Sequence, residues 1–443
     1  MTETTMTPLV GVALLIAIVL ILTQRREKSI TVFLLCCYTI PLGQVLVLGP
    51  LHFTAMRILI IAGLIRRATE RASSSGGKFP GGFNPIDRMV VLWSVSASVV
   101  LTLQWMNVGM LIHELGDFLD GLGGYLVFRS LIPDSETIQR TVKVLATICI
   151  IQGACMINEQ ISHVNIFGYL GGAPIWVAVR DGKIRSAGIM GALYAGTFGG
   201  VLIPLFLWLW TKGQSRMLAG AGLVMATAMA ITANSSTPLL AYAGSFLGLA
   251  FWPLRKQMRL VRWGIVGLLV SLHLTMKAPV WALINHIDLT GSSSGYHRFM
   301  LMDNCIRHFS DWWLLGYKYY DAWGWDMWDL CNQFVVCALT GGLLTLVCYI
   351  SVFSRSFGAL GNARKAVDAD RGREWLLWCL GSTLFATVTA QFGINFMAQM
   401  LMCLFPILAC ISVATFEAMR PVEAKVEMPD DSHLVSVPDL IGP

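Results

Sequence analysis

Charged side chains are scarce in this chain: Asp, Glu, Lys and Arg make up 13% of its 443 residues, whereas 55% are hydrophobic. A soluble globular protein has roughly 25% charged residues, so most of this protein's surface does not face water. Long apolar runs recur, and each can cross a roughly 30 Å hydrocarbon core as a helix. The runs are continuous and not alternating, which excludes a transmembrane barrel. The sequence therefore predicts an all-α fold, a polytopic transmembrane helical bundle.

Metal-type cysteine spacing, internal repeats and a cleavable leader are lacking as well. Most of the 11 cysteines lie singly in apolar runs, where they behave as small hydrophobic residues; Cys305 and Cys331 could form a disulfide. The missing repeat counts against transporter folds built from repeated halves. The first apolar run, Pro8 to Leu22, has no basic segment before it and no small-residue cleavage site after it, so we expect a retained span. No metal or cofactor is implied, and the net charge of +6 does not indicate a nucleic-acid partner.

The apolar runs predict 12 or 13 spans, and charge predicts their orientation. The spans are expected at 8–23, 30–49, 51–65, 88–106, 108–130, 138–156, 187–211, 217–232, 238–254, 263–280, 333–354, 374–391 and 396–417. Lys and Arg gather in alternate connections, which places those connections in the cytoplasm. Segments 157–186 and 277–332 then lie outside. Residues 1–420 form the transmembrane domain, and 421–443 form a cytoplasmic tail that we expect to be disordered.

The outer segment 277–332 is unusually rich in aromatic residues, which alternate with carboxylates such as Asp326 and Asp329. An aromatic belt at the membrane interface explains part of this density. Aromatic faces beside carboxylates also form a surface on which sugar rings can stack and hydrogen-bond. The residues predicted to bind a glycan are Trp312, Trp313, Tyr317, Trp325 and Asn332.

Two arginines of the same segment differ in their expected roles. Ser294 can cap a helix from about Tyr296 to Phe309, which places Arg298 in its first turn. A cation there is unfavourable unless an anion such as a phosphate binds beside it. Arg307 follows Asp303 by four residues, so a helical salt bridge accounts for it.

A second basic group lies at the outer mouth of the span that starts near residue 187. It contains Arg180, Lys183 and Arg185, against the positive-inside bias. Snorkelling at the interface is one explanation. The other is that Arg185 opposes Arg298 so that the two grip a diphosphate.

Ionisable residues inside spans are costly and need an explanation. Arg57 lies within one expected span, and Glu114, Asp117, Asp120 and Arg129 lie within another. Pairing of the carboxylates with the arginines inside the bundle is the favoured interpretation, and a proton path is the alternative.

Three stretches carry a family resemblance: IRSAGIMG, then NSSTPLLAYAGSFLGL, and then SGYHRFMLMDNCIRHFSDWWLLGYKYY followed by NQFVVCALTGGLLTLVCYI. In order and spacing they resemble the O-antigen ligase and O-antigen polymerase superfamily of bacterial membrane glycosyltransferases, over about residues 180–355. The resemblance implies transfer of a glycan from an undecaprenyl-diphosphate carrier to an acceptor saccharide or lipid. The active site would face the periplasm from the bacterial inner membrane, with Arg185 and Arg298 on the diphosphate and no metal.

One position departs from the family pattern. The family's ligases carry a His directly before the Asn that enters the late span, where it serves as base for the acceptor; here Cys331 precedes Asn332. Cys is a poor base for a sugar hydroxyl, so either Asp329, Asp326 or His308 takes that role or this chain uses a different acceptor. A polysaccharide polymerase is then as good an interpretation as a ligase.

Two other classes of function compete with an enzyme. A secondary transporter or flippase for a lipid-linked or anionic solute would need a water-filled path and paired discontinuous helices. A non-catalytic membrane partner in an envelope complex would need no cavity.

Overall fold

Helices make up most of the chain, which the computed structural model describes over residues 4–69, 79–286 and 294–420. In chain order the elements are β1 (Thr4–Thr5), α1 (Pro8–Thr23), α2 (Arg26–Thr39), β2 (Gln44–Leu48), β3 (Leu51–Thr54), α3 (Ala55–Thr69), α4 (Pro85–Trp105), α5 (Val108–Phe118), the π-helical turn η1 (Leu119–Gly123), α6 (Gly124–Leu131), α7 (Ser135–Ser162), the 3-10 helix η2 (Ile166–Leu170), β4 (Ala178–Arg180), β5 (Lys183–Arg185), α8 (Ala192–Lys212), α9 (Arg216–Thr232), α10 (Ser236–Ala250), η3 (Trp252–Gln257), α11 (Met258–Thr275), η4 (Val280–His286), α12 (Ser294–Arg307), α13 (Phe309–Trp312), η5 (Tyr320–Trp323), α14 (Gln333–Ala366), α15 (Arg371–Ala390) and α16 (Gln399–Met419). The predicted tail, 421–443, lies outside the described residues.

Each predicted span coincides with a helix, although several helices are shorter than expected. Within the described residues, 6 helical stretches are long and apolar enough to cross a membrane: α4, α7, α8, η3 with α11, α14 and α16. Two further apolar helices, α1 and α9, are shorter. These helices indicate a multi-pass membrane protein built as an α-helical bundle.

The prediction of continuous helix across 30–49 and 51–65 is wrong. Helix α2 ends at Thr39, and β2 and β3 form an antiparallel hairpin over 44–54. Pro41 cannot donate an amide hydrogen to a continuing helix, and Gly49 takes the left-handed backbone (φ 61°) that the tight turn requires. The intervening stretch, QVLVL, is rich in branched residues, which suit a strand. Apolar composition alone therefore made the first helix too long and placed the start of the second four residues too early.

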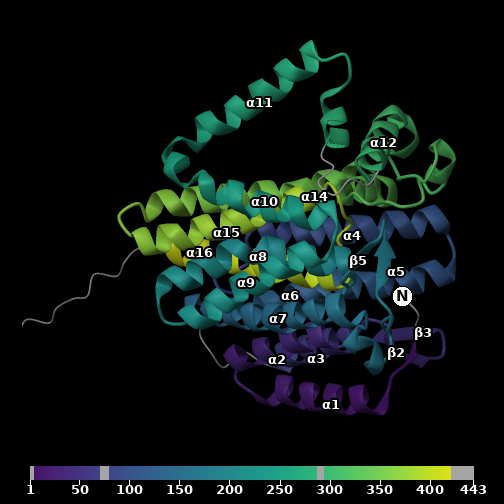
Figure 1. The fold of residues 1–443 in the computed structure, drawn as a ribbon, viewed down its shortest axis with the longest axis vertical. Helices are drawn as coiled ribbons and strands as arrows, with labels where there is room; N and C mark the ends of the chain where they lie inside the picture. The colour runs from purple at the N-terminus through teal and green to yellow at the C-terminus, as the bar shows by residue number, and fades with distance from the viewer. Residues whose placement is uncertain (1–3, 70–78, 287–293, 421–443) are drawn as a thin grey trace, which may run out of the picture.

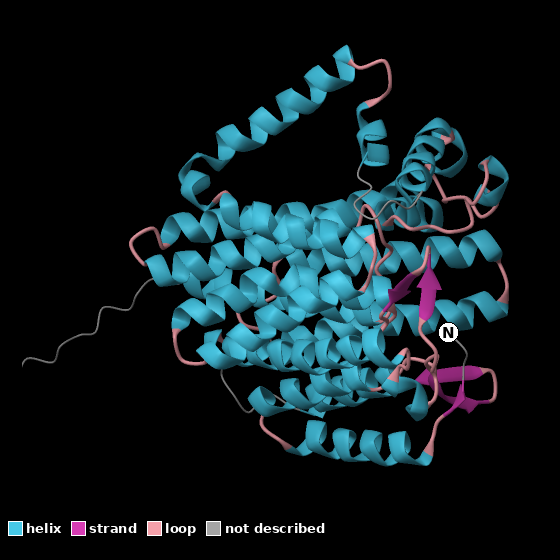
Figure 2. Ribbon diagram, in the orientation of Figure 1, coloured by secondary structure: helices cyan, strands magenta, loops and turns pink. Residues whose placement is uncertain are grey.

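The segments predicted to lie outside the membrane gather at one end of the bundle. Figure 1 shows β5 and α12 at the right, together with the β2–β3 hairpin, whereas the α14–α15 turn lies at the left; β4 pairs with β5 and lies beside it. Figure 2 shows all the strands, in magenta, at this same right-hand end. The described parts of the two longest segments predicted to lie outside, 157–186 and 277–332, are therefore at the same end of the bundle.

Helices α16 and α11 mark the two extremes of burial. Most of α16 is buried inside the bundle, whereas no residue of α11 is buried. Figure 1 shows α11 crossing above the other helices as a separate arm. Its N-terminal base is tied down because Arg255 Nε donates to Glu374 Oε1 of α15 at 2.9 Å.

Helix α14 is interrupted at Gly342, whose backbone is not helical (φ 68°, ψ −171°). The loop after α13 fills the interruption: Tyr317 N donates to Leu339 O at 2.7 Å, and Leu343 N donates to Trp313 O at 2.8 Å. The Gln104 side chain of α4 donates to Leu339 O at 3.0 Å. The broken helix therefore keeps its backbone groups hydrogen-bonded through protein partners.

Candidate functional site

Helix α12 holds Arg298 against the N-terminal end of α10. The side chain is 6% exposed, and its Nη2 donates to Thr237 Oγ1 at 2.8 Å. The Thr237 hydroxyl in turn donates to Gly393 O at 3.0 Å, so its orientation is fixed. A Cβ added at Gly393 would lie 3.1 Å from Arg298 Nε, which shows how closely the backbone approaches the guanidinium. The helix predicted from Tyr296 to Phe309 is thus present as α12 and brings a buried cation to the outer end of the bundle.

Arg185 lies at the end of the β4–β5 hairpin, half-buried. Its Nε is buried and has no hydrogen-bond partner within the described part of the chain. Burial lowers the pKa of Arg185, and the positive charge of Arg180 on the neighbouring strand lowers it further. A half-buried guanidinium beside a second cation is a favourable place for an anion.

One turn, 232–237, connects the strand of Arg185 with Arg298. Asn234 Nδ2 donates to Ile184 O at 2.6 Å, next to Arg185 in the chain. Thr237, three residues further on, receives Arg298. The polar turn that the sequence singled out therefore touches both predicted diphosphate-binding segments.

The predicted carboxylates Asp326 and Asp329 return to the N-terminal end of α12, where they meet a residue pair that the sequence analysis did not connect. His297 Nδ1 lies 3.3 Å from Cys331 Sγ, and His297 Nε2 lies 2.9 Å from Asp326 O. Burial raises the pKa of Cys331 to about 11; the charge of Arg298 opposes the shift, and those of Asp329 and Asp326 add to it. His297, Arg298, Cys331 and the two carboxylates thus form one group.

His308, the third predicted base, does not join this group. It lies just beyond α12, about 16 Å along the helix axis from His297. Its Nδ1 lies 3.2 Å from Asp311 Oδ2, and its ring stacks on Trp323 at 4.5 Å. The structure therefore brings together two of the three predicted bases and leaves His308 apart.

The predicted glycan-binding aromatics divide into packed and exposed side chains. Trp312 is 4% exposed, and its indole N–H donates to Cys305 O at 2.6 Å, so it belongs to the interior of the outer segment. Tyr317 stacks on Trp323 at 5.1 Å. Trp313 is 46% exposed and Trp325 is 80% exposed. Only the last two present open faces on which a sugar could stack.

Asn332 has a structural position at the start of α14. It is 1% exposed, and its Oδ1 accepts hydrogen bonds from Phe334 N at 3.0 Å and Val335 N at 3.3 Å. This is an N-cap, which satisfies helix amides that would otherwise lack partners. The cap accounts for Asn332 without a bound glycan.

Tyr194 and Asn395 were not predicted and also lie beside the group. The Tyr194 hydroxyl donates to Asn395 Oδ1 at 2.8 Å, and Asp329 lies within electrostatic range of Tyr194. Tyr194 belongs to the first turn of α8, soon after Arg185 in the chain. No local spacing rule could have linked either residue to the outer segment, because the contacts join distant parts of the sequence.

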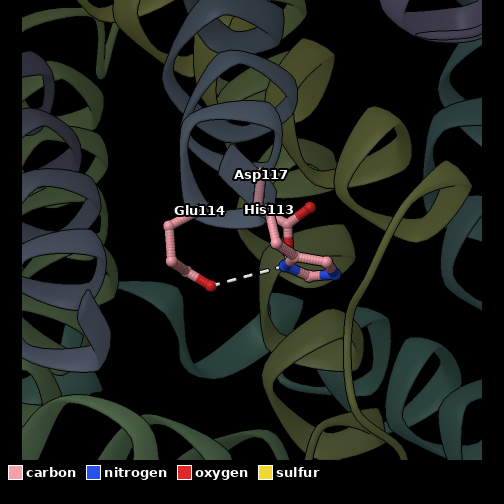
Figure 3. Close-up of side chains that lie close together, drawn as sticks. All are labelled: His113, Glu114 and Asp117. Carbon is pink, nitrogen blue, oxygen red and sulfur yellow. Dashed lines mark ion pairs between the residues drawn. The ribbon is translucent and has the colours of Figure 1, made fainter. Parts of the chain in front are cut away.

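The ionisable residues of α5 and η1 form a second cluster. Figure 3 shows His113, Glu114 and Asp117; His113 Nδ1 lies 3.6 Å from Glu114 Oε1 and 3.7 Å from Asp117 Oδ2. Arg57 Nη2 lies 2.6 Å from Asp120 Oδ2 and 3.5 Å from Asp117 Oδ1. The predicted pairing with Arg57 is confirmed, whereas Arg129 pairs with Asp87 of α4, its Nε 3.1 Å from Asp87 Oδ1.

Two further local predictions can be checked at the outer segment. Arg307 Nε lies 2.6 Å from Asp303 Oδ2, which confirms the expected helical salt bridge. Cys305 and Cys331 are both free thiols, so no disulfide joins them. The group around His297 is therefore held together without a disulfide between these two residues.

Comparison of the chain with protein-family models and with curated proteins finds no match.

Proposed function

We propose that this protein is an integral-membrane glycosyltransferase. It transfers or polymerises a glycan from an undecaprenyl-diphosphate donor onto an acceptor saccharide or lipid. The observation that supports this most concerns one turn, 232–237, which two distant segments contact. Arg298 donates to Thr237 of this turn, and Asn234 of the same turn donates to Ile184 O, next to Arg185 in the chain. The Arg185 side chain is only half-buried, and its Nε has no hydrogen-bond partner among the described residues, so the exposed part of the guanidinium can bind a phosphate oxygen.

The two arginines would act on the leaving group. When the bond between the sugar and the diphosphate breaks, negative charge grows on the diphosphate. Donors fixed beforehand where this charge develops lower the barrier, typically by a factor of about 10²–10³ for each donor. Arginine binds phosphate through parallel N–H groups, so the proposed step needs no metal ion.

The acceptor would approach from the side of Asp326 and Asp329. The exposed faces of Trp313 and Trp325 belong to the same outer segment and are suited to sugar rings. Ligase and polymerase chemistry share this donor and differ only in the acceptor. The proposal therefore covers both.

We also propose a number of membrane crossings and an orientation of the chain, which the helices alone do not give. The chain would cross a bacterial inner membrane 12 or 13 times, with the α12 end in the periplasm. Support comes from the gathering of β4, β5 and α12 at one end of the bundle (Figure 1) and from the basic connections expected at the other. Cysteine accessibility on the two sides of spheroplast membranes would test this orientation.

The decisive experiment uses full-length protein in lipid nanodiscs with an undecaprenyl-diphosphate glycan and a sugar acceptor. Arg185→Ala and Arg298→Ala should each lower transfer by about 10²–10³-fold. Lys183→Ala is the matched control, because this exposed cation lies on the same hairpin as Arg185. If both arginine variants transfer at the wild-type rate, the site is wrong.

A transporter or flippase remains the competing proposal, since α14 is discontinuous as such folds require. The interruption is filled by the 313–317 loop, which favours the enzyme. Movement of a lipid-linked glycan across a liposome membrane, with no glycan product, would favour the transporter.

A further inference from the structure

Both ring nitrogens of His297 are engaged, and the partner on one side fixes the state of the other. Nε2 lies 2.9 Å from the backbone carbonyl oxygen of Asp326. A carbonyl oxygen only accepts hydrogen bonds, so Nε2 carries the hydrogen. In the neutral ring Nδ1 is then unprotonated, and its lone pair faces Cys331 Sγ at 3.3 Å.

The thiol is the donor in this contact. Burial raises the pKa of Cys331 to about 11, so the sulfur keeps its proton at neutral pH and donates it towards Nδ1. A thiol is a weak donor, and a sugar hydroxyl is a stronger one. A hydroxyl that reached Nδ1 would therefore exchange a weak hydrogen bond for a better one.

The position of the ring is set by backbone that carries strain. Asp326 has a left-handed φ of 60°, which is uncommon for a residue other than glycine. This conformation directs its carbonyl to His297 Nε2, while its carboxylate oxygen Oδ2 lies 3.9 Å from the same nitrogen. A nucleophile or base held by a third group in this way is typical of catalytic sites.

The charged groups around the ring match the needs of a proton acceptor. Arg298 follows His297 in α12 and donates to Thr237 of the turn where the diphosphate would bind. The Asp326 carboxylate, with Oδ2 3.9 Å from Nε2, would stabilise an imidazolium that forms during the step. The His297 side chain is 11% exposed, so the ring is mostly shielded from water.

We propose that His297 is the group that accepts the proton of the acceptor hydroxyl, and that Cys331 occupies the hydroxyl's position at Nδ1 in the resting enzyme. This inference rests on the proposed transferase function. It assigns the base to a residue of α12, one position before the diphosphate-binding arginine. Asp326 is a positioning residue.

The step balances without a further reactant. The acceptor O–H bond breaks, and its proton passes to His297 Nδ1. The oxygen's electron pair forms the new bond to the anomeric carbon, while the bond from that carbon to the diphosphate oxygen breaks and its electron pair stays on the diphosphate. The imidazolium then returns its proton to the released diphosphate.

The test measures transfer by full-length His297→Gln in nanodiscs across pH. We expect kcat to fall by about 10²–10⁴-fold with little change in KM for the donor. In the wild type, the rate should fall on the acidic side, because a base that already carries a proton cannot accept another, and this acidic limb should vanish in His297→Gln. Asp326→Asn keeps the backbone carbonyl that accepts from His297 Nε2, so kcat should fall only about tenfold. This variant serves as a second test if His297→Gln folds poorly.

His308→Gln is the matched control, since this second histidine lies at the other end of α12 and outside the group. Transfer by His297→Gln within tenfold of the wild type, with the acidic limb retained, overturns the proposal. A glycan covalently attached to Cys331, detected by mass spectrometry of its peptide, also overturns it, because the thiol would then be a nucleophile.

A second readout needs no glycan. Iodoacetamide modification of Cys331, measured relative to Cys305 by peptide mass spectrometry, should slow at least about threefold in His297→Gln, because Nδ1 no longer accepts the thiol proton. An unchanged ratio overturns the pairing of the two side chains. If the pairing is found but the wild type transfers no glycan, the transferase function itself is wrong, and the role of His297 as base falls with it.

Discussion

Helix α12 carries an arginine and a histidine at each end, and the two ends use them differently. At the N-terminal end, Arg298 is 6% exposed and donates to Thr237, which lies 61 residues away in the chain. His297 contacts Cys331, 34 residues away. At this end both side chains are committed to distant partners.

At the C-terminal end the same residue types pair locally. The Arg307 side chain is 71% exposed and binds Asp303, four residues before it. His308 pairs with Asp311, three residues after it. Exposed local ion pairs contribute little to stability or to a site. The comparison teaches that buried, long-range partners, and not residue type, distinguish the end of α12 that we propose as the site.

The two ends should differ most in how the rate of transfer responds when each arginine is replaced by lysine, which keeps the positive charge. Arg298→Lys should lower transfer by about tenfold or more, because lysine lacks the planar fork that can hold Thr237 and a phosphate together. Arg307→Lys should change transfer by less than about twofold. Initial rates at saturating donor provide the measurement, and equal losses at both positions would remove the distinction.

The next prediction concerns the loop that follows the C-terminal end and fills the break in α14. Gly342→Ala forces a left-handed φ on alanine and places its Cβ 2.6 Å from Leu314 O, so it should destabilise the protein by about 1–3 kcal/mol. Gly358→Ala, in the same helix with open space around it, should stabilise by about 0.5–1 kcal/mol. Thermal unfolding in one detergent compares them; a stable Gly342→Ala variant would mean that the break is not needed.

The pH dependence of thiol reactivity allows the two ends of α12 to be compared, because each end has one cysteine near it. Burial raises the pKa of Cys331, near the N-terminal end, to about 11 and that of Cys305, near the C-terminal end, to about 12. Only the thiolate reacts, so both should be slow at pH 8 and accelerate as pH rises, Cys331 first. Near pH 10 we expect Cys331 to react about tenfold faster with iodoacetamide, since one pKa unit is tenfold in thiolate. Fast labelling of either residue at pH 7 in the folded protein would contradict the burial.

The smallest expected effect is at His308. His308→Ala removes the stacking on Trp323 and should cost about 0.5–1.5 kcal/mol of stability. Transfer should stay within about twofold. Differential scanning fluorimetry and the transfer assay measure the two quantities; a large loss of transfer at normal stability would return His308 to the list of bases.

Periodicity and charge predicted the helices well, because each apolar run must bury its backbone polar groups in a helix. They failed at 44–54, where Pro41 and the turn at Gly49 favour a hairpin over helix despite the apolar composition. They also placed the start of α8 too early: Gly188 and Gly191 have positive φ, so the helix begins at Ala192.

The candidate site could be predicted only in part. Arg298 was recognisable because a cation in the first turn of a helix conflicts with the helix dipole. His297 was beside it, but nothing local links it to Cys331. Trp312 and Asn332 were predicted to bind a glycan from their residue types; in the structure Trp312 packs internally and Asn332 caps α14. Long-range packing decides these cases, and residue type does not report it.

The interruption of α14 has a consequence for how the outer segment can be handled in the laboratory. Residues 313–317 supply hydrogen bonds to the backbone of a membrane helix, so this segment is a structural insert and not a detachable cap. Excising it, or expressing it as a separate soluble fragment, would leave amide and carbonyl groups of the severed helix facing hydrocarbon, at several kcal/mol each. A chimera that exchanges this segment with a related protein should therefore have one junction before α12 and the other after Leu343. Residues 313–317 and the part of α14 to which they hydrogen-bond are then exchanged together.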